Sequence, residues 1–194
     1  MSTLTADPGF ARGQVLGILW KAYDAETGDG SHVIGARKVF RDEDPKSGKI
    51  LSNRTVECIA VKNVSGGALL PGSLVKFKAA ATTGQFSGGI LGEVDATATT
   101  TNATPAANGL IGIVDEYLPT AGVADKEVFW LVIRGPSTVT KTSTSVSAGA
   151  AYGTSATAGS AAAHTAGTTT LIGYAIEDSA TTSGRLLVRT AAGF

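Results

Sequence analysis

Residues 127–134 read Glu-Val-Phe-Trp-Leu-Val-Ile-Arg and are followed by Gly135-Pro136. β-Branched and aromatic side chains dominate this run, and both kinds are enriched in strands. A run of four to eight such residues that ends at a Gly-Pro turn is typical of a β-strand. The stretch therefore predicts a strand at the centre of the fold.

Similar short runs lie on both sides of this stretch, each close to Gly, Pro, Asn or Ser residues. They cover residues 56–61, 73–78, 109–114, 171–176 and 185–189. The chain also has 25 glycines and few stretches with a helical period. Together these features predict an all-β fold with a small β-sandwich or barrel as its body.

Part of this body repeats. Leu110-Ile-Gly-Ile-Val-Asp-Glu116 is similar to Leu171-Ile-Gly-Tyr-Ala-Ile-Glu-Asp178. A turn of small residues precedes each copy, at residues 70–73 and 147–150, and a strand-like run follows each copy. Two copies are too few for a solenoid. They predict a pseudo-symmetric pair of β units that share one core, and chance similarity is the alternative.

Charged residues concentrate near the N-terminus. Residues 1–62 hold nine of the 16 basic and eight of the 16 acidic side chains, and Ala, Thr, Ser and Gly dominate after Asn63. We therefore divide the 194-residue chain into an N-terminal arm or hairpin region, residues 1–55, and a β-rich body, residues 56–194.

The formal net charge is zero, so the sequence offers no basic surplus to neutralise phosphates or an anionic membrane. We expect neither nucleic acid nor membrane as a partner. No signal peptide and no apolar run of about 20 residues is evident, which predicts a soluble protein made in a cytoplasm. The lone cysteine, Cys58, excludes an internal disulfide and is expected to be a buried thiol.

The sequence lacks the residue sets that catalysis, metal binding or cofactor binding requires. The only histidines, His32 and His164, lie far apart and near no nucleophile motif. The acidic clusters at residues 24–29 and 42–44 do not match a calcium loop. The carboxylates at 115–116 and 177–178 follow apolar runs and are expected to end strands on the surface. We expect a non-enzymatic protein without metal or cofactor.

Residues 56–194 resemble the small capsid cement, or head decoration, proteins of tailed bacteriophages. The resemblance lies in the order of the elements: the strand at 56–61, Leu70-Pro-Gly-Ser-Leu-Val75, Gly109–Asp115, Val128–Gly135, Ser147–Gly153, and Leu171–Asp178 with Arg185–Arg189. It implies a β-rich virion protein on the capsid exterior that stabilises the capsid. It also implies the major capsid protein as partner, and a homo-oligomer such as the trimers that these proteins often form.

The charged N-terminal region departs from that family pattern. Its large side chains next to Arg and Lys are typical of contact surfaces. The interpretation is an arm that orders against capsid subunits, and the alternative is a hairpin packed on its own body. The candidate capsid-binding residues are Phe10, Trp20, Tyr23, Arg37, Lys38, Phe40 and Arg41.

A second function remains open on the sequence alone. An adhesive or carbohydrate-binding β module of a phage tail or surface appendage has a similar composition. Sugar platforms usually use several exposed aromatic rings, and this chain has two Trp and four Tyr residues.

Overall fold

The computed structural model describes residues 34–77, 111–142 and 145–189, and the backbone of 19–20 and 93–97. This part of the chain contains strands and turns and no helix, which confirms the predicted all-β class. The strands are β1 (Leu19–Trp20), β2 (Arg37–Glu43), β3 (Ile50–Asn63), β4 (Leu74–Phe77), β5 (Glu93–Thr97), β6 (Ile111–Val114), β7 (Val128–Thr140), β8 (Ala151–Thr154), β9 (Ala161–Ala163), β10 (Leu171–Ala175) and β11 (Ser183–Arg189). None of these residues forms a helix long and apolar enough to span a membrane.

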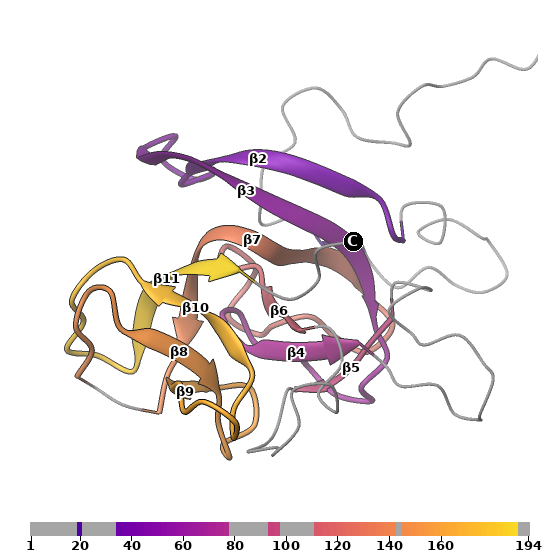
Figure 1. Ribbon diagram of the computed structural model, residues 1–194. Helices are drawn as coiled ribbons and strands as arrows, with labels where there is room; N and C mark the ends of the chain where they lie inside the picture. Colours follow the sequence, from indigo (N-terminus) through magenta and orange to yellow (C-terminus); the bar gives the residue numbers. More distant parts are fainter. Residues whose placement is uncertain (1–18, 21–33, 78–92, 98–110, 143–144, 190–194) are drawn as a thin grey trace, which may run out of the picture.

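Five strands close into a small barrel (Figure 1). Their order is β3, β5, β4, β6 and β7, and β7 returns to pair with β3. The pairing of β3 with β5 is parallel, whereas the other four are antiparallel. The barrel interior holds side chains such as Ile59, Val75, Phe129 and Leu131. Closure leaves no free edge within the barrel, but β3 and β7 both extend beyond it.

Strand β7 is buried on both faces. Phe129, Leu131 and Ile133 point into the barrel, whereas Val128 and Trp130 belong to a second core outside it. Alternating side chains of one strand thus serve two cores. This double burial explains why residues 128–133 read as a continuous apolar run. The prediction from residues 127–134 is confirmed, but β7 continues past Gly135-Pro136 to Thr140.

The predicted repeat appears as two units with the same strand order. The first unit is ordered β5-β4-β6-β7, and the second is ordered β9-β8-β10-β11, with β7 paired to β11 between them. Gly72 N donates to Val114 O, and the equivalent Gly149 N donates to Ala175 O. The return bonds match as well, from Val114 N to Ser73 O and from Ala175 N to Ala150 O. Both units contribute to the second core.

Strands β2 and β3 form a long antiparallel hairpin along one side of the molecule (Figure 1). The boundary predicted between residues 55 and 56 falls inside β3, which runs unbroken from Ile50 to Asn63. Phe40 of β2 is only 7% exposed, and its ring meets that of Trp130 edge to face, with centroids 5.3 Å apart. Residues 37–55 therefore pack on the body as a hairpin, whereas residues 1–18 and 21–33 lie outside the described part of the chain.

Candidate functional site

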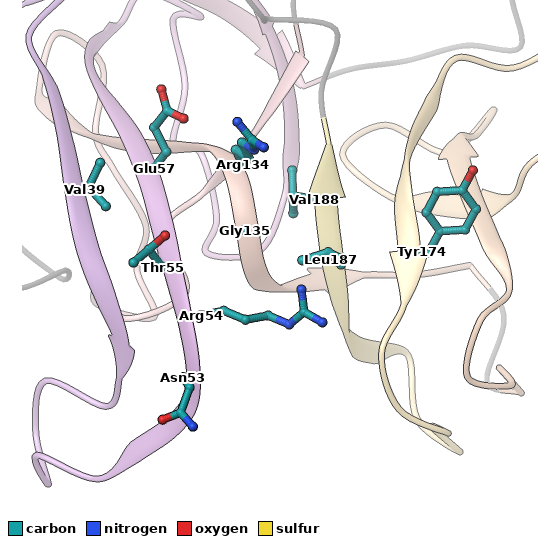
Figure 2. Close-up of a pocket in the computed structure, with 10 residues that line it drawn as sticks. All are labelled: Val39, Asn53, Arg54, Thr55, Glu57, Arg134, Gly135, Tyr174, Leu187 and Val188. Carbon is teal, nitrogen blue, oxygen red and sulfur yellow. The ribbon is translucent and has the colours of Figure 1, made fainter.

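A groove opens where β7 changes its partner strand. β3 pairs with β7 as far as the Glu57–Arg134 pair, and β11 pairs with β7 from Arg134 to Thr140. Figure 2 shows β3 and β11 on opposite sides of the resulting gap. The gap is a cavity of about 700 Å³, which we call the β3 groove. Its lining residues are Val39, Asn53, Arg54, Thr55, Glu57, Arg134, Gly135, Tyr174, Leu187 and Val188.

Gly135 sets the distance between β3 and β7 at this point. Its φ is +103°, and a Cβ placed there would lie 2.2 Å from the carbonyl oxygen of Thr55. Only glycine adopts this conformation easily and also allows so close an approach. The next residue is Pro136, which has no backbone N–H to donate to a neighbouring strand. It lies just past the point where the pairing of β7 with β3 ends and the pairing with β11 continues.

A bulge in β7 places Arg134 beside the groove. Cys58 pairs with Val132, but Glu57 pairs with Arg134, so Ile133 is an extra residue on β7. The alternation along β7 continues through the bulge, so Ile133 points into the barrel core like Phe129 and Leu131. The bulge changes the pairing instead: it brings the exposed Arg134 opposite Glu57, and both residues line the groove.

Positive charge dominates the groove. Arg54 reaches from β3 across the gap towards Leu187 of β11 (Figure 2). Glu57 is the only carboxylate among the described lining residues, and it lies 3.7 Å from Arg37. A smaller cavity of about 150 Å³ shares Asn53, Arg54 and Thr55 with the groove and adds a third lining arginine, Arg41.

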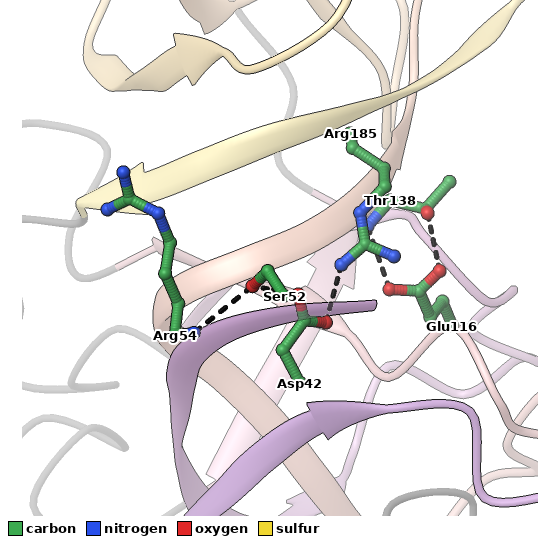
Figure 3. Close-up of polar contacts among 6 residues, drawn as sticks. All are labelled: Asp42, Ser52, Arg54, Glu116, Thr138 and Arg185. Atoms are coloured by element: carbon green, nitrogen blue, oxygen red, sulfur yellow. Dashed lines mark hydrogen bonds and ion pairs between the residues drawn. The ribbon is translucent and has the colours of Figure 1, made fainter. Parts of the chain in front are cut away.

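Buried polar contacts hold the hairpin against the body. Asp42 of β2 accepts hydrogen bonds from Ser52 Oγ and from Arg185 Nη2 of β11, both at 2.5 Å (Figure 3). Glu116 lies nearby and accepts from the backbone N–H and the hydroxyl of Thr138. Burial opposes the charge on Arg185, but Glu116 and Asp42 outweigh it and raise the pKa of Arg185 above its ordinary value. The hairpin is therefore anchored at its far end as well as at Phe40.

The structure places the predicted capsid-binding residues in different surroundings. Arg37 and Arg41 are exposed on the same face of β2. Lys38 lies on the other face, with Nζ 5.5 Å from the centre of the Phe40 ring. Phe40 is a core residue, so its side chain does not form a contact surface. Trp20 is described only by its backbone, which pairs with Val128, and Phe10 and Tyr23 lie outside the described residues.

The acidic and histidine side chains considered for catalysis have structural contacts where they are described. Asp115 was expected on the surface but is buried, where it accepts a hydrogen bond from Tyr117 N, whereas the exposed Asp178 accepts one from Ala148 N. His164 Nδ1 lies 2.8 Å from Thr169 Oγ1. Within the described ranges, no three His, Cys, Asp or Glu side chains cluster closely enough to hold a metal ion. His32 and residues 24–29 lie outside those ranges.

Two buried ionisable groups lie away from the groove. Burial, with smaller contributions from Asp115 and Glu57, raises the pKa of the Cys58 thiol well above its ordinary value. The expected buried thiol is thus confirmed. Burial lowers the pKa of Lys141, and its Nζ has no hydrogen-bond partner among the described residues.

Sequence reasoning missed three residues of the β3 groove: Arg54, Arg134 and Tyr174. One signal was present for Arg134, since a charged residue between an apolar strand and Gly135-Pro136 stands at a strand irregularity. A second signal, for Tyr174, was present in the repeat. Tyr174 in the second copy occupies the position that the buried Ile113 has in the first copy. A large polar side chain that replaces a core residue in a repeat indicates a different surface.

No protein-family model matches the chain, and no curated protein matches it in sequence. Among solved structures, the chain is similar to the N base of the head fiber gp8.5 of bacteriophage phi29. The TM-score is 0.35 and the sequence identity 14%, and the match covers 68% of this chain and 93% of that chain. A likeness of this extent carries no argument about function, which has to come from the residues of this chain.

Proposed function

We propose that this chain is a non-enzymatic structural protein of a bacteriophage virion. It binds the outer surface of the capsid through the major capsid protein and stabilises the assembled shell. It acts as a homo-oligomer made of three copies of the chain. The resemblance of residues 56–194 to capsid cement proteins supports this function, and the exposed face of the β2–β3 hairpin supplies the contact surface.

The observation that carries the proposal is the mixture of side chains on that hairpin. Val39 is 60% exposed and Ile50 is 55% exposed, and Arg37 and Arg41 are exposed beside Val39 on β2. Exposed aliphatic groups next to arginines are typical of protein contact surfaces. The hairpin is held rigidly by Phe40 and Asp42, so binding orders little additional chain.

Co-sedimentation with shells that lack this protein tests the proposal. The native chain is expected to pellet with the shells, and the Val39→Asp/Ile50→Asp variant is expected to remain in the supernatant. Leu70→Asp is the matched control, because Leu70 is also exposed but lies in the turn before β4. Failure of the native chain to pellet, or equal loss in the control, would contradict the proposal.

Binding to sugars is the competing outcome. Tyr174 is the only aromatic residue among the described residues that line the β3 groove, and it is 43% exposed. An adhesive module would bind host glycans on an array and would not pellet with shells. That pair of results would replace the capsid function with the adhesive one.

A further inference from the structure

We propose that the β3 groove binds an extended acidic segment of another polypeptide chain, and we assign that segment to a subunit of the shell. The source of the segment rests on the function proposed above. The chemistry of the groove does not rest on it, because it follows from the charge, the strand pairing and the aliphatic surface of the groove itself.

The charge of the groove requires an acidic ligand. Arg54 and Arg134 are exposed at the groove, and neither has an ion-pair partner among the described residues. Arg41 lines the adjoining cavity. Glu57, the only carboxylate among the described lining residues, is already close to Arg37. Arginine binds carboxylates through two parallel hydrogen bonds, so carboxylates at spaced positions are the complementary ligand.

The backbone of β3 favours an extended peptide. β3 lies between β2 and β7, and its pairing with β7 ends at Glu57. On the edge that faces the groove, residues 50–56 therefore have no partner strand in the described part of the chain. Ser52 Oγ accepts the N–H of Arg54. Asn53, Arg54 and Thr55 on this edge line the groove, and unpaired strand edges bind added strands.

The aliphatic surface favours a peptide over a saccharide. Val39 and Leu187 both line the groove, and the exposed Ile50 lines the adjoining cavity. Aliphatic side chains of a peptide bury such surface with a gain in free energy. Sugars, in contrast, commonly stack on aromatic rings, and the described part of the lining offers one ring, that of Tyr174.

Three fluorescent probes with equal numbers of carboxylates test the groove on the native chain. They are a peptide of alternating Glu and Val, a peptide of alternating Glu and Pro, and an oligogalacturonate. We expect the Glu-Val peptide to bind at least about tenfold more tightly than the other two, because only it can form a strand and bury aliphatic surface. Equal binding of all probes, tighter binding of the saccharide, or no binding of the Glu-Val peptide overturns the proposal.

Charge reversal locates the site. Arg54→Glu/Arg134→Glu is expected to weaken binding of the Glu-Val peptide by more than about tenfold, and Arg54→Gln/Arg134→Gln by less. Lys126→Glu, at an exposed lysine that does not line the groove, is expected to change binding less than about twofold. Circular dichroism confirms that each variant folds. A similar loss in the Lys126 variant would mean that the peptide responds to overall charge and would overturn the site.

Photo-crosslinking identifies the source. With p-benzoylphenylalanine in place of the exposed Asn53, ultraviolet light is expected to link the chain to an acidic segment of a shell subunit, identified by mass spectrometry. Crosslinks to another protein, or to a segment without carboxylates, overturn the assigned source. If the chain fails to bind shells but still binds the Glu-Val peptide, the proposed function fails and the groove chemistry stands.

Discussion

Gly135 is the residue at which β7 leaves β3 and joins β11. A Cβ at this position would lie 2.2 Å from the carbonyl oxygen of Thr55 and 3.0 Å from the Cα of Val56. Both atoms belong to the backbone, so neither can turn aside as a flexible side chain can. The close approach of β3 to β7, and with it the shape of the β3 groove, depends on the absence of a side chain at this position.

Gly135→Ala is expected to lower the free energy of unfolding by more than about 3 kcal/mol, because a strained φ and a backbone clash combine. Gly149→Ala is the matched control. Its φ is +81°, but a Cβ there meets nothing within 4 Å, so the expected loss is about 1 kcal/mol. Urea denaturation of both variants measures the difference. Equal losses would show that β3 does not lie close to Gly135.

Arg185 lies between two acidic side chains, Asp42 on β2 and Glu116 after β6. Removing one member of a buried ion pair leaves the other charge without compensation. Arg185→Met is therefore expected to destabilise the protein by about 3 kcal/mol, whereas Asp42→Asn combined with Arg185→Met should cost less than the sum of the two single changes. Thermal denaturation of the three variants measures this coupling. Additive losses would mean that the two residues do not interact.

At the scale of the element, the β2–β3 hairpin has two faces with different roles. Neighbouring residues of a strand point to opposite faces. Phe40 packs against Trp130, whereas Val39 points outward. Stability and attachment should therefore separate between two adjacent positions of β2.

Phe40→Ala is expected to destabilise the protein by about 3 kcal/mol, because it leaves a cavity over Trp130. Val39→Ala is expected to change stability by less than about 0.5 kcal/mol, because its side chain is already in water. Denaturation of both variants and co-sedimentation with shells measure the two effects. The hairpin interpretation would be wrong if Val39→Ala destabilised the protein as much as Phe40→Ala.

At the scale of the whole molecule, the barrel protects its strands but the sheet beyond it does not close. β2 and β9 stand at the two ends of the strand order. Open edges of this kind attract further strands unless they are covered or charged. The second unit has few charges, so pairing around a closed axis with identical chains is a suitable way to cover them.

A trimer is the expected oligomer, with a mass by light scattering of three times that of the chain. Shells carrying it are expected to dissociate at a higher temperature than bare shells, because the trimer binds assembled shell better than free subunits. Weak contacts repeated across a trimer also gain from effective concentration. A monomer that leaves the dissociation temperature of the shells unchanged would contradict this prediction.

The order of short apolar runs was enough to predict the all-β class, the strand at residues 127–134 and the pairing of two similar units. These features depend on local composition and on the period of two along a strand, which sequence carries directly. The alternation in β2 likewise requires Val39 and Phe40 to point in opposite directions.

Only the tertiary structure decided which of the two points inward, because the answer depends on Trp130, far away in the chain. The β3 groove has the same origin. Its residues come from β2, β3, β7, β10 and β11, and its geometry follows from a bulge at Ile133 and a close approach at Gly135. Asp42 and Arg185 are 143 positions apart. Local sequence patterns specify the strands, but contacts over such separations arise only once the strands have paired and the barrel has closed.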